Sequence, residues 1–260
     1  MTMEPCIDTA TTSINSPLCA PLWRKESGML KFISGLACAL ALVAVLVANG
    51  AYAAEDTVNP LKGIIEPDVE NAATIKLRSG SGDPVAGREK SLLCQGCHGE
   101  YGISMEPLIP SLAGQYANYI EKEIRNFQSG IRSHQIMNAM AGTIENEQDL
   151  ADIAAYFASQ KKMEGDGEGD PDGQEIFLHG DLSKMRLACV NCHGVRGKGL
   201  EVKISMFPVI GGQQKEYIRK QLINFRDGDR TNSPNGIMNR ITNSLTDSEI
   251  DSLADYISAQ

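Results

Sequence analysis

The chain carries one short cysteine motif twice. "LLCQGCHGE" (92–100) and "LACVNCHGV" (187–195) each contain two cysteines and a histidine in the order C-x-x-C-H. The cysteines are Cys94, Cys97, Cys189 and Cys192, and the histidines are His98 and His193. Any fold assigned to this chain has to explain why it presents this arrangement of side chains twice.

An uncharged, largely apolar stretch precedes both motifs. It covers residues 32–54 and contains the small-residue pattern A-Y-A at 51–53, which is typical of a cleaved secretory signal. The competing interpretation is an uncleaved membrane anchor, since the stretch is long enough to span a bilayer. Translation can begin at Met1 or at Met29. We therefore expect a bacterial protein exported to the periplasm, either soluble or tethered to the membrane.

After the predicted cleavage point, every cysteine belongs to a C-x-x-C-H motif, because Cys6, Cys19 and Cys38 all precede it. Two short disulfides are one interpretation, since exported proteins usually pair their cysteines, but disulfides leave the adjacent histidines unexplained. Zinc is another interpretation, yet a structural zinc takes four ligands and each motif offers three. His134 and His179 could complete two zinc sites, but they occupy unrelated positions relative to the two motifs.

Covalent haem attachment accounts for every functional group of the motif. In a c-type haem site the two thiols form thioethers to the porphyrin vinyl groups, and the adjacent histidine ligates the iron. The sequence therefore predicts two haem c groups. The predicted attachment residues are Cys94, Cys97, Cys189 and Cys192, and the predicted iron ligands next to them are His98 and His193.

The duplication extends far beyond the cysteines. "PSLAGQYANYIEKEIRNFQSGIR" (110–132) aligns without a gap on "PVIGGQQKEYIRKQLINFRDGDR" (208–230), and residues 149–160 match residues 249–260. The offset between matching positions grows slowly along the chain, as loop insertions produce. We therefore expect two copies of one domain in tandem.

Composition and the limits of the repeat divide the chain. The acidic, glycine-containing segment between the copies is expected to be a solvated linker. Calcium binding there is disfavoured, because Pro171 and Phe177 occupy positions where an EF-hand needs glycine and glutamate. The predicted organisation is an upstream segment plus signal peptide or anchor (1–53), a flexible leader (54–82), domain 1 (83–160), a linker (161–172) and domain 2 (173–260).

Hydrophobic periodicity predicts an all-α fold. Thr246 and Glu249 form a capping box at the start of the last helix, and Asp83-Pro84 is a typical helix start. The apolar stripes of the two last helices are Leu150, Ile153, Ala154 and Phe157 in the first copy and Ile250, Leu253, Ala254 and Ile257 in the second. Further helices are expected through Tyr119 and Phe127 and through Tyr217 and Phe225. Because domains this small have marginal cores, a haem would supply the missing apolar centre.

The sixth iron ligand decides between an electron carrier and a catalyst, because an open iron position admits oxygen or substrate. Met137 and Met238 stand at equivalent positions just before the last helix of each copy. Other methionines lack an equivalent partner and suit core packing better. His134 is the main rival of Met137, but the second copy has no histidine near that place.

The motifs "CQGCHG", "PSLAGQYANYI", "FQSGIR" and "IMNAM", with their echoes in the second copy, resemble the di-haem class I cytochromes c of the cytochrome c4 family over residues 83–260. The resemblance implies two cytochrome c domains related by an approximate two-fold axis. It also implies axial ligation by His98 and Met137 in domain 1 and by His193 and Met238 in domain 2. The sequence departs from the family pattern in two ways. The interval from His98 to Met137 is shorter than that from His193 to Met238, and the leader before domain 1 is long.

The same resemblance implies electron transfer in the periplasm from a respiratory donor complex towards a terminal oxidase. It also suggests that Pro110 and Pro208 support the loops beside the histidines. With both iron positions filled we expect relatively high potentials, since a thioether ligand favours the ferrous state. The alternative is the haem subunit of a periplasmic oxidoreductase of the sulfide- or thiosulfate-oxidising type. A third class is a non-haem exported module that uses disulfides or zinc.

Net charge and the placement of residues exclude some functions. A net charge of -9 disfavours nucleic acid as a partner. We do not expect a self-contained enzyme, because the mature chain has no spare cysteine to ligate iron and no catalytic carboxylate or histidine is placed alike in both copies. Residues 84–160 carry 5 Lys and Arg against 9 Asp and Glu, whereas residues 173–260 carry 11 against 10. This asymmetry either orients docking or simply serves solubility.

Overall fold

The structure, a computed structural model, describes residues 72–200 and 207–260. All described residues belong to one compact unit of the chain. The predicted signal peptide or anchor at 1–53 lies outside the described residues. Within the described ranges, no helix has both the length and the apolar character needed to cross a membrane.

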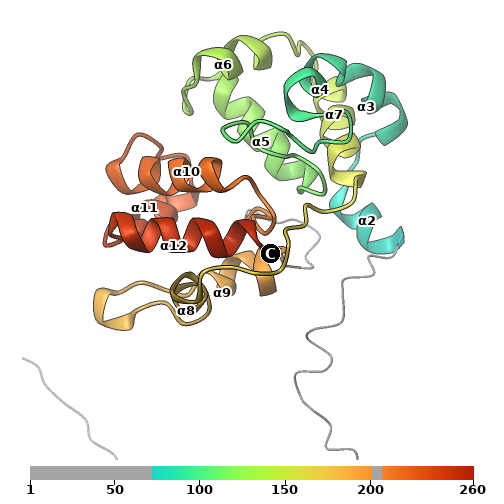
Figure 1. The fold of residues 1–260 in the computed structure, drawn as a ribbon. Coiled ribbons are helices and arrows are strands. Elements are labelled where there is room, and N and C mark those ends of the chain that lie inside the picture. Colours follow the sequence, from blue (N-terminus) through green and yellow to red (C-terminus); the bar gives the residue numbers. More distant parts are fainter. Residues whose placement is uncertain (1–71, 201–206) are drawn as a thin grey trace, which may run out of the picture. The chain divides into compact units, whose positions relative to one another are not determined.

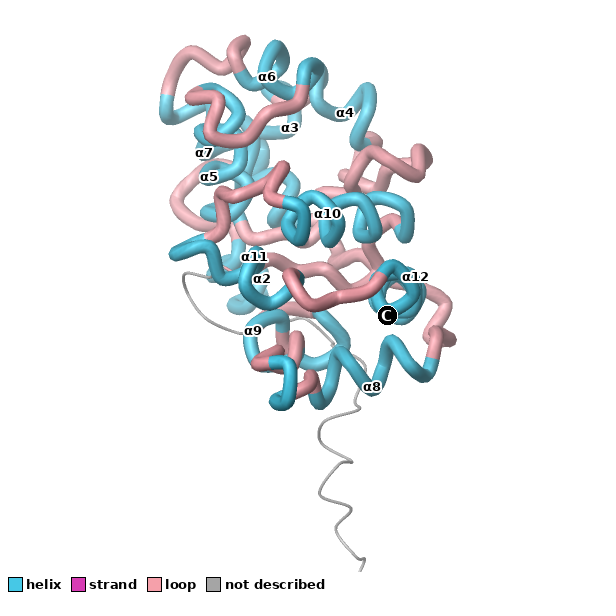
Figure 2. The backbone as a smooth tube through the Cα atoms, turned by 90° about the vertical axis from the view of Figure 1, so that its left-hand side faces the viewer, coloured by secondary structure: helices cyan, strands magenta, loops and turns pink. Residues whose placement is uncertain are grey.

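The described residues form helices joined by loops, and the one pairing of extended chain among them is an isolated bridge between Asp181 and Arg186 (Figures 1 and 2). The predicted all-α fold class is confirmed. The first half of the unit contains α2 (Ala72–Arg78), α3 (Pro84–Lys90), α4 (Leu92–His98), α5 (Ala117–Gln128), α6 (Gln135–Ala141) and α7 (Glu147–Ser159). The second half contains α8 (Pro171–His179), η1 (Leu182–Lys184), α9 (Val190–His193), η2 (Val195–Gly197), α10 (Lys215–Asp227), η3 (Pro234–Gly236), α11 (Ile237–Thr242) and α12 (Asp247–Ser258).

In each half an early helix crosses the last helix at very short range, α3 against α7 and α8 against α12. A glycine permits each crossing. A Cβ atom on Gly87 would lie 1.9 Å from the carbonyl oxygen of Asp152, and one on Gly173 would lie 2.0 Å from that of Ser252. Only a residue without a side chain allows such close backbone approach. The two crossings are therefore equivalent parts of one repeated fold.

The helix starts follow the sequence signals. Asp83 caps α3 by accepting hydrogen bonds from the backbone N–H groups of Val85 and Ala86, with proline in the first turn. Thr246 and Glu249 form the predicted capping box of α12. These caps satisfy backbone donors that would otherwise lack intrahelical partners.

The apolar stripes of α7 and α12 lie in the cores of their own halves. Every residue of the two predicted stripes is buried. In the first half, Phe157 packs with Ala117 and Ile120 of α5. In the second half, the α12 stripe packs with Phe177 of α8 and Ile218 of α10. Periodicity in the sequence therefore identified the core face of both last helices.

Two segments that were expected to be loosely held are packed against the halves. Arg78, in the predicted flexible leader, is buried, and its guanidinium donates to the carbonyl oxygens of Ala158 at 2.6 Å and Gln160 at 2.9 Å. Met163, in the predicted solvated linker, is only 1% exposed. The chain also enters α8 at Pro171, inside the range predicted as linker. The expectation of a loose leader and linker is wrong at these residues, because each contributes a side chain that the core covers.

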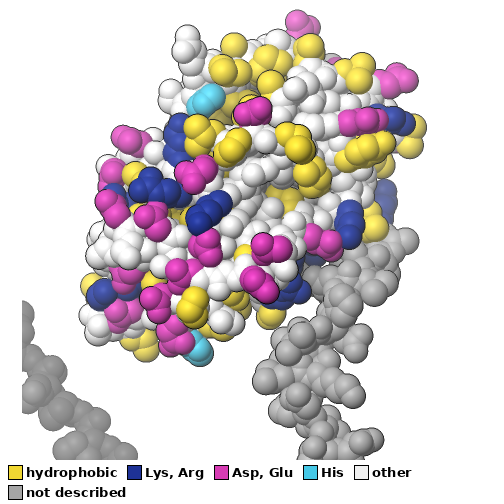
Figure 3. All heavy atoms as spheres, viewed as in Figure 1, with side chains coloured by type: hydrophobic (Ala, Val, Ile, Leu, Met, Phe, Trp, Pro, Cys, Tyr) yellow, Lys and Arg dark blue, Asp and Glu magenta, His cyan; other side chains and the backbone are white. Residues whose placement is uncertain are grey.

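Charged and hydrophobic side chains are distributed unevenly over the face shown in Figure 3. Lysine, arginine, aspartate and glutamate side chains gather over α8–α12, and hydrophobic side chains are more frequent over α3–α7 (compare Figure 1). Exposed hydrophobic residues of the first half include Leu92, Leu93, Met105 and Ile131. On this face the second half thus carries more charged side chains of both signs than the first.

Candidate haem sites

Each C-x-x-C-H motif lies on a helix that ends at its histidine, α4 in the first half and α9 in the second. Cys94 is partly buried and packs against the first core, and Cys189 does the same against the second core. Burial raises the pKa of the Cys94 thiol, and it raises that of Cys189 to about 11. Cys97 is exposed and Cys192 half-buried, and all four cysteines are free thiols.

The two histidines have the same environment. His98 and His193 are 6% and 7% exposed. The Nδ1 atom of His98 lies 2.8 Å from the carbonyl oxygen of Pro110, and that of His193 lies 2.9 Å from the carbonyl oxygen of Pro208. Since a carbonyl can only accept, Nδ1 carries the proton in each ring and Nε2 keeps its lone pair. The expected support of the histidines by the two prolines is present.

Burial lowers the pKa of both imidazoles, although the bond to each proline carbonyl opposes that effect. Both rings are therefore held in the neutral form with a fixed tautomer. A neutral imidazole whose second nitrogen is hydrogen-bonded to a carbonyl is the usual state of a metal-ligating histidine.

A glycine follows each histidine because the chain must turn sharply there. Gly99 has φ of 85° and Gly194 has φ of 76°. A Cβ atom at Gly99 would lie 2.1 Å from the carbonyl oxygen of Ile103, and one at Gly194 would lie 2.0 Å from that of Gly199. The left-handed turn leaves no room for a side chain. It directs the chain into the loop whose proline carbonyl returns to the histidine.

Met137 and Met238 are both half-buried and lie near the start of equivalent helices, α6 and α11. The N–H of Met137 donates to Nδ1 of His134 at 3.3 Å, and the N–H of Met238 donates to Oγ of Ser233 at 3.2 Å. His134 is exposed and acts as the cap of α6. In the second half Ser233 accepts the hydrogen bond from the methionine N–H, although the N-cap of α11 is Gly236.

An asparagine follows each of these methionines and holds its helix to the rest of its half. Asn138 Nδ2 donates to the carbonyl oxygen of Phe127 at 2.6 Å, and Asn239 Nδ2 donates to that of Phe225 at 2.7 Å. Both asparagines also donate to an arginine carbonyl, that of Arg132 or Arg230. The two methionine segments are therefore fixed by the same contacts.

Histidines outside the motifs do not complete a metal-binding cluster. His179 lies at the exposed end of α8, where its Nε2 is 3.7 Å from a carboxylate oxygen of Glu175. Across the part of the chain that the structure describes, no three His, Cys, Asp or Glu side chains converge on one point.

A buried polar cluster joins the halves, and sequence reasoning did not foresee it. We call this set the interdomain cluster: Tyr119, Glu123 and Arg132 with Tyr217, Gln221, Arg230 and Asn232. Its contacts are reciprocal, because Arg132 donates to the hydroxyl of Tyr217 at 3.0 Å and Arg230 to that of Tyr119 at 3.1 Å. Glu123 accepts from Arg132 at 2.7 Å and from Arg230 at 3.2 Å. The two tyrosines occupy matching positions in the sequence repeat, and so do the two arginines. This match is the sequence feature that could have suggested the cluster.

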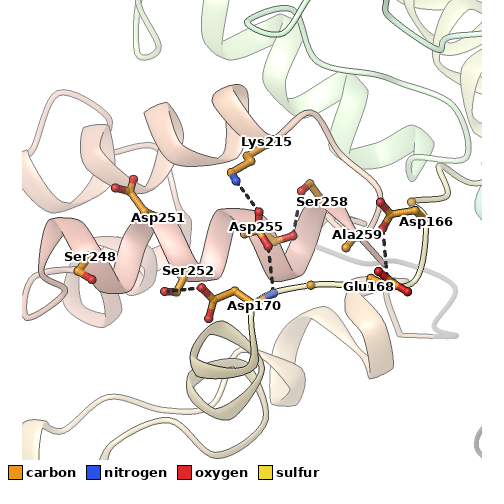
Figure 4. A pocket seen from close by; sticks show the side chains of 12 residues that line it. Asp166, Glu168, Asp170, Lys215, Ser248, Asp251, Ser252, Asp255, Ser258 and Ala259 are labelled. Atoms are coloured by element: carbon orange, nitrogen blue, oxygen red, sulfur yellow. Dashed lines mark hydrogen bonds and ion pairs between the residues drawn. The ribbon is translucent and has the colours of Figure 1, made fainter.

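A pocket lined by carboxylates lies beside α12 and the segment that leads into α8 (Figure 4). Asp255 accepts a hydrogen bond from the backbone N–H of Asp170 at 3.0 Å and pairs with Lys215. Asp170 in turn accepts from the hydroxyl of Ser252 at 3.2 Å. These bonds attach the start of α8 to α12, and none of the predicted haem-binding residues lines this pocket.

The side chains around each motif suit a c-type haem. Each half offers two free thiols separated by two residues, a buried neutral imidazole with an unprotonated Nε2 and a partly buried thioether on a separate short helix. Thiols, imidazole and thioether are the groups that attach and ligate a c-type haem. The chemistry of the donor set therefore fits the predicted cofactor in both halves.

Comparison with known families identifies both halves. The family described as Cytochrome c matches residues 91–161 and again residues 172–260. The two matched segments coincide with the two copies of the motif.

Individual proteins resemble both halves together. Cytochrome c4 of Pseudomonas aeruginosa is 39% identical over 188 residues, which is 70% of this chain and 90% of that protein. A thiosulfate dehydrogenase electron acceptor of Stutzerimonas stutzeri is 32% identical over 185 residues, 68% of this chain and 81% of that protein. The crystal structure of reduced recombinant cytochrome c4 from Pseudomonas stutzeri superimposes with a TM-score of 0.64 at 35% identity and covers 69% of this chain and 99% of its own.

Proposed function

The chain belongs to the cytochrome c family and takes two c-type haems as cofactors, and we propose that it carries electrons in the periplasm from a respiratory donor complex to a terminal oxidase. When bound, each haem iron accepts and releases one electron. Similarity to cytochromes c4 indicates a di-haem electron carrier. The observation that carries the proposal is the same histidine and proline contact beside both C-x-x-C motifs.

The attachment residues in this proposal are Cys94 and Cys97 in the first half and Cys189 and Cys192 in the second. The first cysteine of each pair packs against its core and the second is more accessible. Thioether bonds at both positions would fix a haem to the helix that carries the histidine. A rigid support suits electron transfer, because little needs to rearrange when the charge changes.

His98 and His193 are proposed as the iron ligands on the motif side. Each ring is buried and oriented by its proline carbonyl, with Nε2 free to bind metal. Met137 and Met238 are proposed as the ligands on the opposite side. Support for the methionines comes from their equivalent places on α6 and α11 and from matched contacts of the neighbouring asparagines. His134 is a weaker candidate, since its side chain is exposed and the second half has no histidine near the equivalent position.

The same proposal includes the periplasmic location and cleavage of the signal in 1–53. It also includes the division into domains 83–160 and 173–260. The apolar stretch with its A-Y-A pattern supports export.

A second candidate function is the electron-accepting haem subunit of a thiosulfate-oxidising enzyme. The specific observation in its favour is the 32% identity to the thiosulfate dehydrogenase electron acceptor of Stutzerimonas stutzeri. In this role the partner subunit performs the chemistry and the chain removes the electrons. The two candidates share both haem sites and differ in the redox partner.

Rapid-mixing kinetics separate the two candidates. The haem-loaded mature protein is reduced chemically and mixed with membranes that contain a terminal oxidase, and its reoxidation is followed optically. In parallel, the oxidised protein is mixed with thiosulfate and a catalytic thiosulfate dehydrogenase subunit. Fast reoxidation by membranes without thiosulfate-dependent reduction supports the respiratory carrier. Fast reduction only in the second mixture contradicts it and favours the subunit role.

A further inference from the structure

Two buried glutamines exchange hydrogen bonds between the halves. Gln115, in the first half, donates from Nε2 to the carbonyl oxygen of Val209 at 2.8 Å and accepts from the N–H of Val209 at 2.9 Å. Gln213, in the second half, makes the same pair with Ser111, at 2.8 Å in both directions. The glutamines are 5% and 6% exposed. Each therefore satisfies both backbone groups of one residue in the opposite half.

The residues they bind belong to the peptide groups that hold the histidines. The carbonyl of Pro110 and the N–H of Ser111 are the two ends of one planar peptide group. Its oxygen accepts from Nδ1 of His98, and its N–H donates to Oε1 of Gln213. The Pro208 peptide group repeats this arrangement between His193 and Gln115.

Hydrogen bonds in such a chain reinforce one another. When the N–H end of a peptide donates to an amide oxygen, the carbonyl end becomes a stronger acceptor. A stronger acceptor draws the Nδ1 proton, which increases electron donation from Nε2 to a bound metal. Gln213 is thus connected to His98 through one peptide group, and Gln115 is connected in the same way to His193.

We propose that each glutamine is a positioning residue for the iron-ligating histidine of the opposite half, so that Gln213 tunes the first haem and Gln115 tunes the second. This inference rests on the proposed assignment of His98 and His193 as iron ligands. If the glutamines act in this way, the contact between the halves is part of both haem sites. A change confined to one half then alters the haem of the other half.

The test replaces each glutamine by methionine, which has a similar length but cannot make the two hydrogen bonds. The readouts on the haem-loaded mature protein are the two assigned reduction potentials and the NMR resonance of each histidine Nδ1 proton. Gln213→Met is expected to raise the potential of the first haem and to speed solvent exchange of the His98 Nδ1 proton several-fold. Gln115→Met is expected to produce the same changes at the second haem and at His193.

Two tyrosine variants are the matched controls. Tyr119→Phe and Tyr217→Phe each remove one hydrogen bond between the halves without touching a proline peptide. Both are expected to leave the two Nδ1 protons unchanged. Should a methionine variant fail to fold, Gln115→Glu and Gln213→Glu keep an acceptor for the backbone N–H and replace the amide donor by a carboxyl group. Because an added charge acts on both potentials, the readout for these variants is the Nδ1 resonance, which is expected to shift only at the histidine of the opposite half.

The proposal predicts a crossed effect, in which a glutamine variant in one half changes the histidine and haem of the other half. A change at the histidine of the same half, equal changes at both histidines or no change at either would overturn the proposal. If the unmodified protein instead lacks the spectrum of histidine-ligated haem, the ligand assignment fails. That failure is visible before any variant is made and is therefore distinct from failure of the crossed effect.

Discussion

The two halves reach the same histidine geometry by different routes. In the first half, α3 and α4 follow one another with only Ser91 between them, and the histidine ends a helix of 7 residues. In the second half, α8 is followed by a turn containing the Asp181 and Arg186 bridge, and the histidine ends a helix of only 4 residues. Nevertheless, the distance from Nδ1 to the proline carbonyl oxygen is 2.8 Å in one half and 2.9 Å in the other.

This comparison shows which parts of the repeat are constrained. The length of the motif helix varies, whereas the glycine after the histidine and the returning proline carbonyl do not. In the second half, Arg186 compensates for the longer turn by pairing with Glu249 of α12 at 3.0 Å. The orientation of each histidine is thus fixed by the loop that follows it rather than by the helix that carries it.

The halves also differ in charge at the contact between them. Glu123 and Gln221 occupy matching positions in the repeat, and both accept from Arg132 and Arg230. Only the first half contributes a carboxylate at this position. An otherwise reciprocal cluster is therefore electrostatically unequal.

The largest expected effect comes from the proposed methionine ligands. Met137→Ala should lower the potential of the first haem only, and Met238→Ala that of the second only, because a thioether favours the ferrous state. A shift on the order of 0.1 V is expected, within the roughly 0.8 V that axial ligands span. The altered haem should also bind carbon monoxide. Optical redox titration with and without carbon monoxide measures both effects.

Met140→Ile is the matched control, since the second half has Ile241 at the equivalent position. It should change neither the potential nor the response to carbon monoxide. Unaltered potentials in Met137→Ala or Met238→Ala would rule out that residue as a ligand.

Glu123→Gln is expected to have the next largest effect, on stability. Burial disfavours the charged form of Glu123, but Arg230, Arg132 and Lys122 together outweigh it and lower its pKa to about 2. A carboxyl group with a lowered pKa stabilises the fold above its ordinary pKa of 4.5, and that contribution disappears as the pH falls towards 2. The variant should lose about 3 kcal/mol of unfolding free energy at pH 7, with the difference shrinking below pH 4.5.

Denaturant unfolding of the haem-loaded protein at several pH values measures this difference. Glu147→Gln removes an exposed carboxylate of the same half and should have little effect. Parallel pH profiles for Glu123→Gln and the unmodified protein would contradict the assigned role of the cluster.

The glycine crossings should respond equally in the two halves. Gly87→Ala and Gly173→Ala both force a Cβ atom into a backbone carbonyl of the facing helix, and overpacking of this kind costs about 2 kcal/mol. Thermal unfolding monitors the loss. Val85→Ala on α3 and Gln174→Ala on α8 change exposed positions and should remain within about 0.5 kcal/mol. A loss in one half alone would show that the crossings are not equivalent.

The smallest effect is expected at the caps of the last helices. Asn146 caps α7 through the N–H of Asp149 at 2.8 Å, and Thr246 caps α12 through the N–H of Glu249 at 3.2 Å. Asn146→Ala and Thr246→Ala should each cost about 1 kcal/mol in unfolding free energy. Thr246→Ser keeps the hydroxyl and should restore most of the loss. An unchanged unfolding free energy in Thr246→Ala would mean that the capping box adds nothing to stability.

Local signals in the sequence predicted the helix starts and the buried faces of the last helices well. The caps at Asp83 and Thr246 and the apolar stripes are short-range patterns, and the structure contains them as expected. The burial of Met163 and Arg78 was not predictable, because it depends on surfaces formed by residues distant in sequence. The glycine-rich acidic composition of the segment around Met163 does not reveal that this one side chain packs with Tyr116 and Val209.

The contacts between the halves could not be predicted either, because they also depend on residues distant in sequence. The repeat alignment matches Gln115 with Gln213, yet it says nothing about where either side chain points. Reciprocal bonding requires the two copies to face each other, which is a property of tertiary structure. Equivalent buried polar residues in a tandem repeat are a signal that would have suggested such a contact.

The central claim is that both halves hold closed, histidine- and methionine-ligated haems for electron transfer. The most direct test is an optical redox titration of the haem-loaded mature protein, repeated under carbon monoxide. We predict two relatively high-potential one-electron centres whose spectra carbon monoxide does not change. A low-potential haem, or one that binds carbon monoxide, would contradict the account.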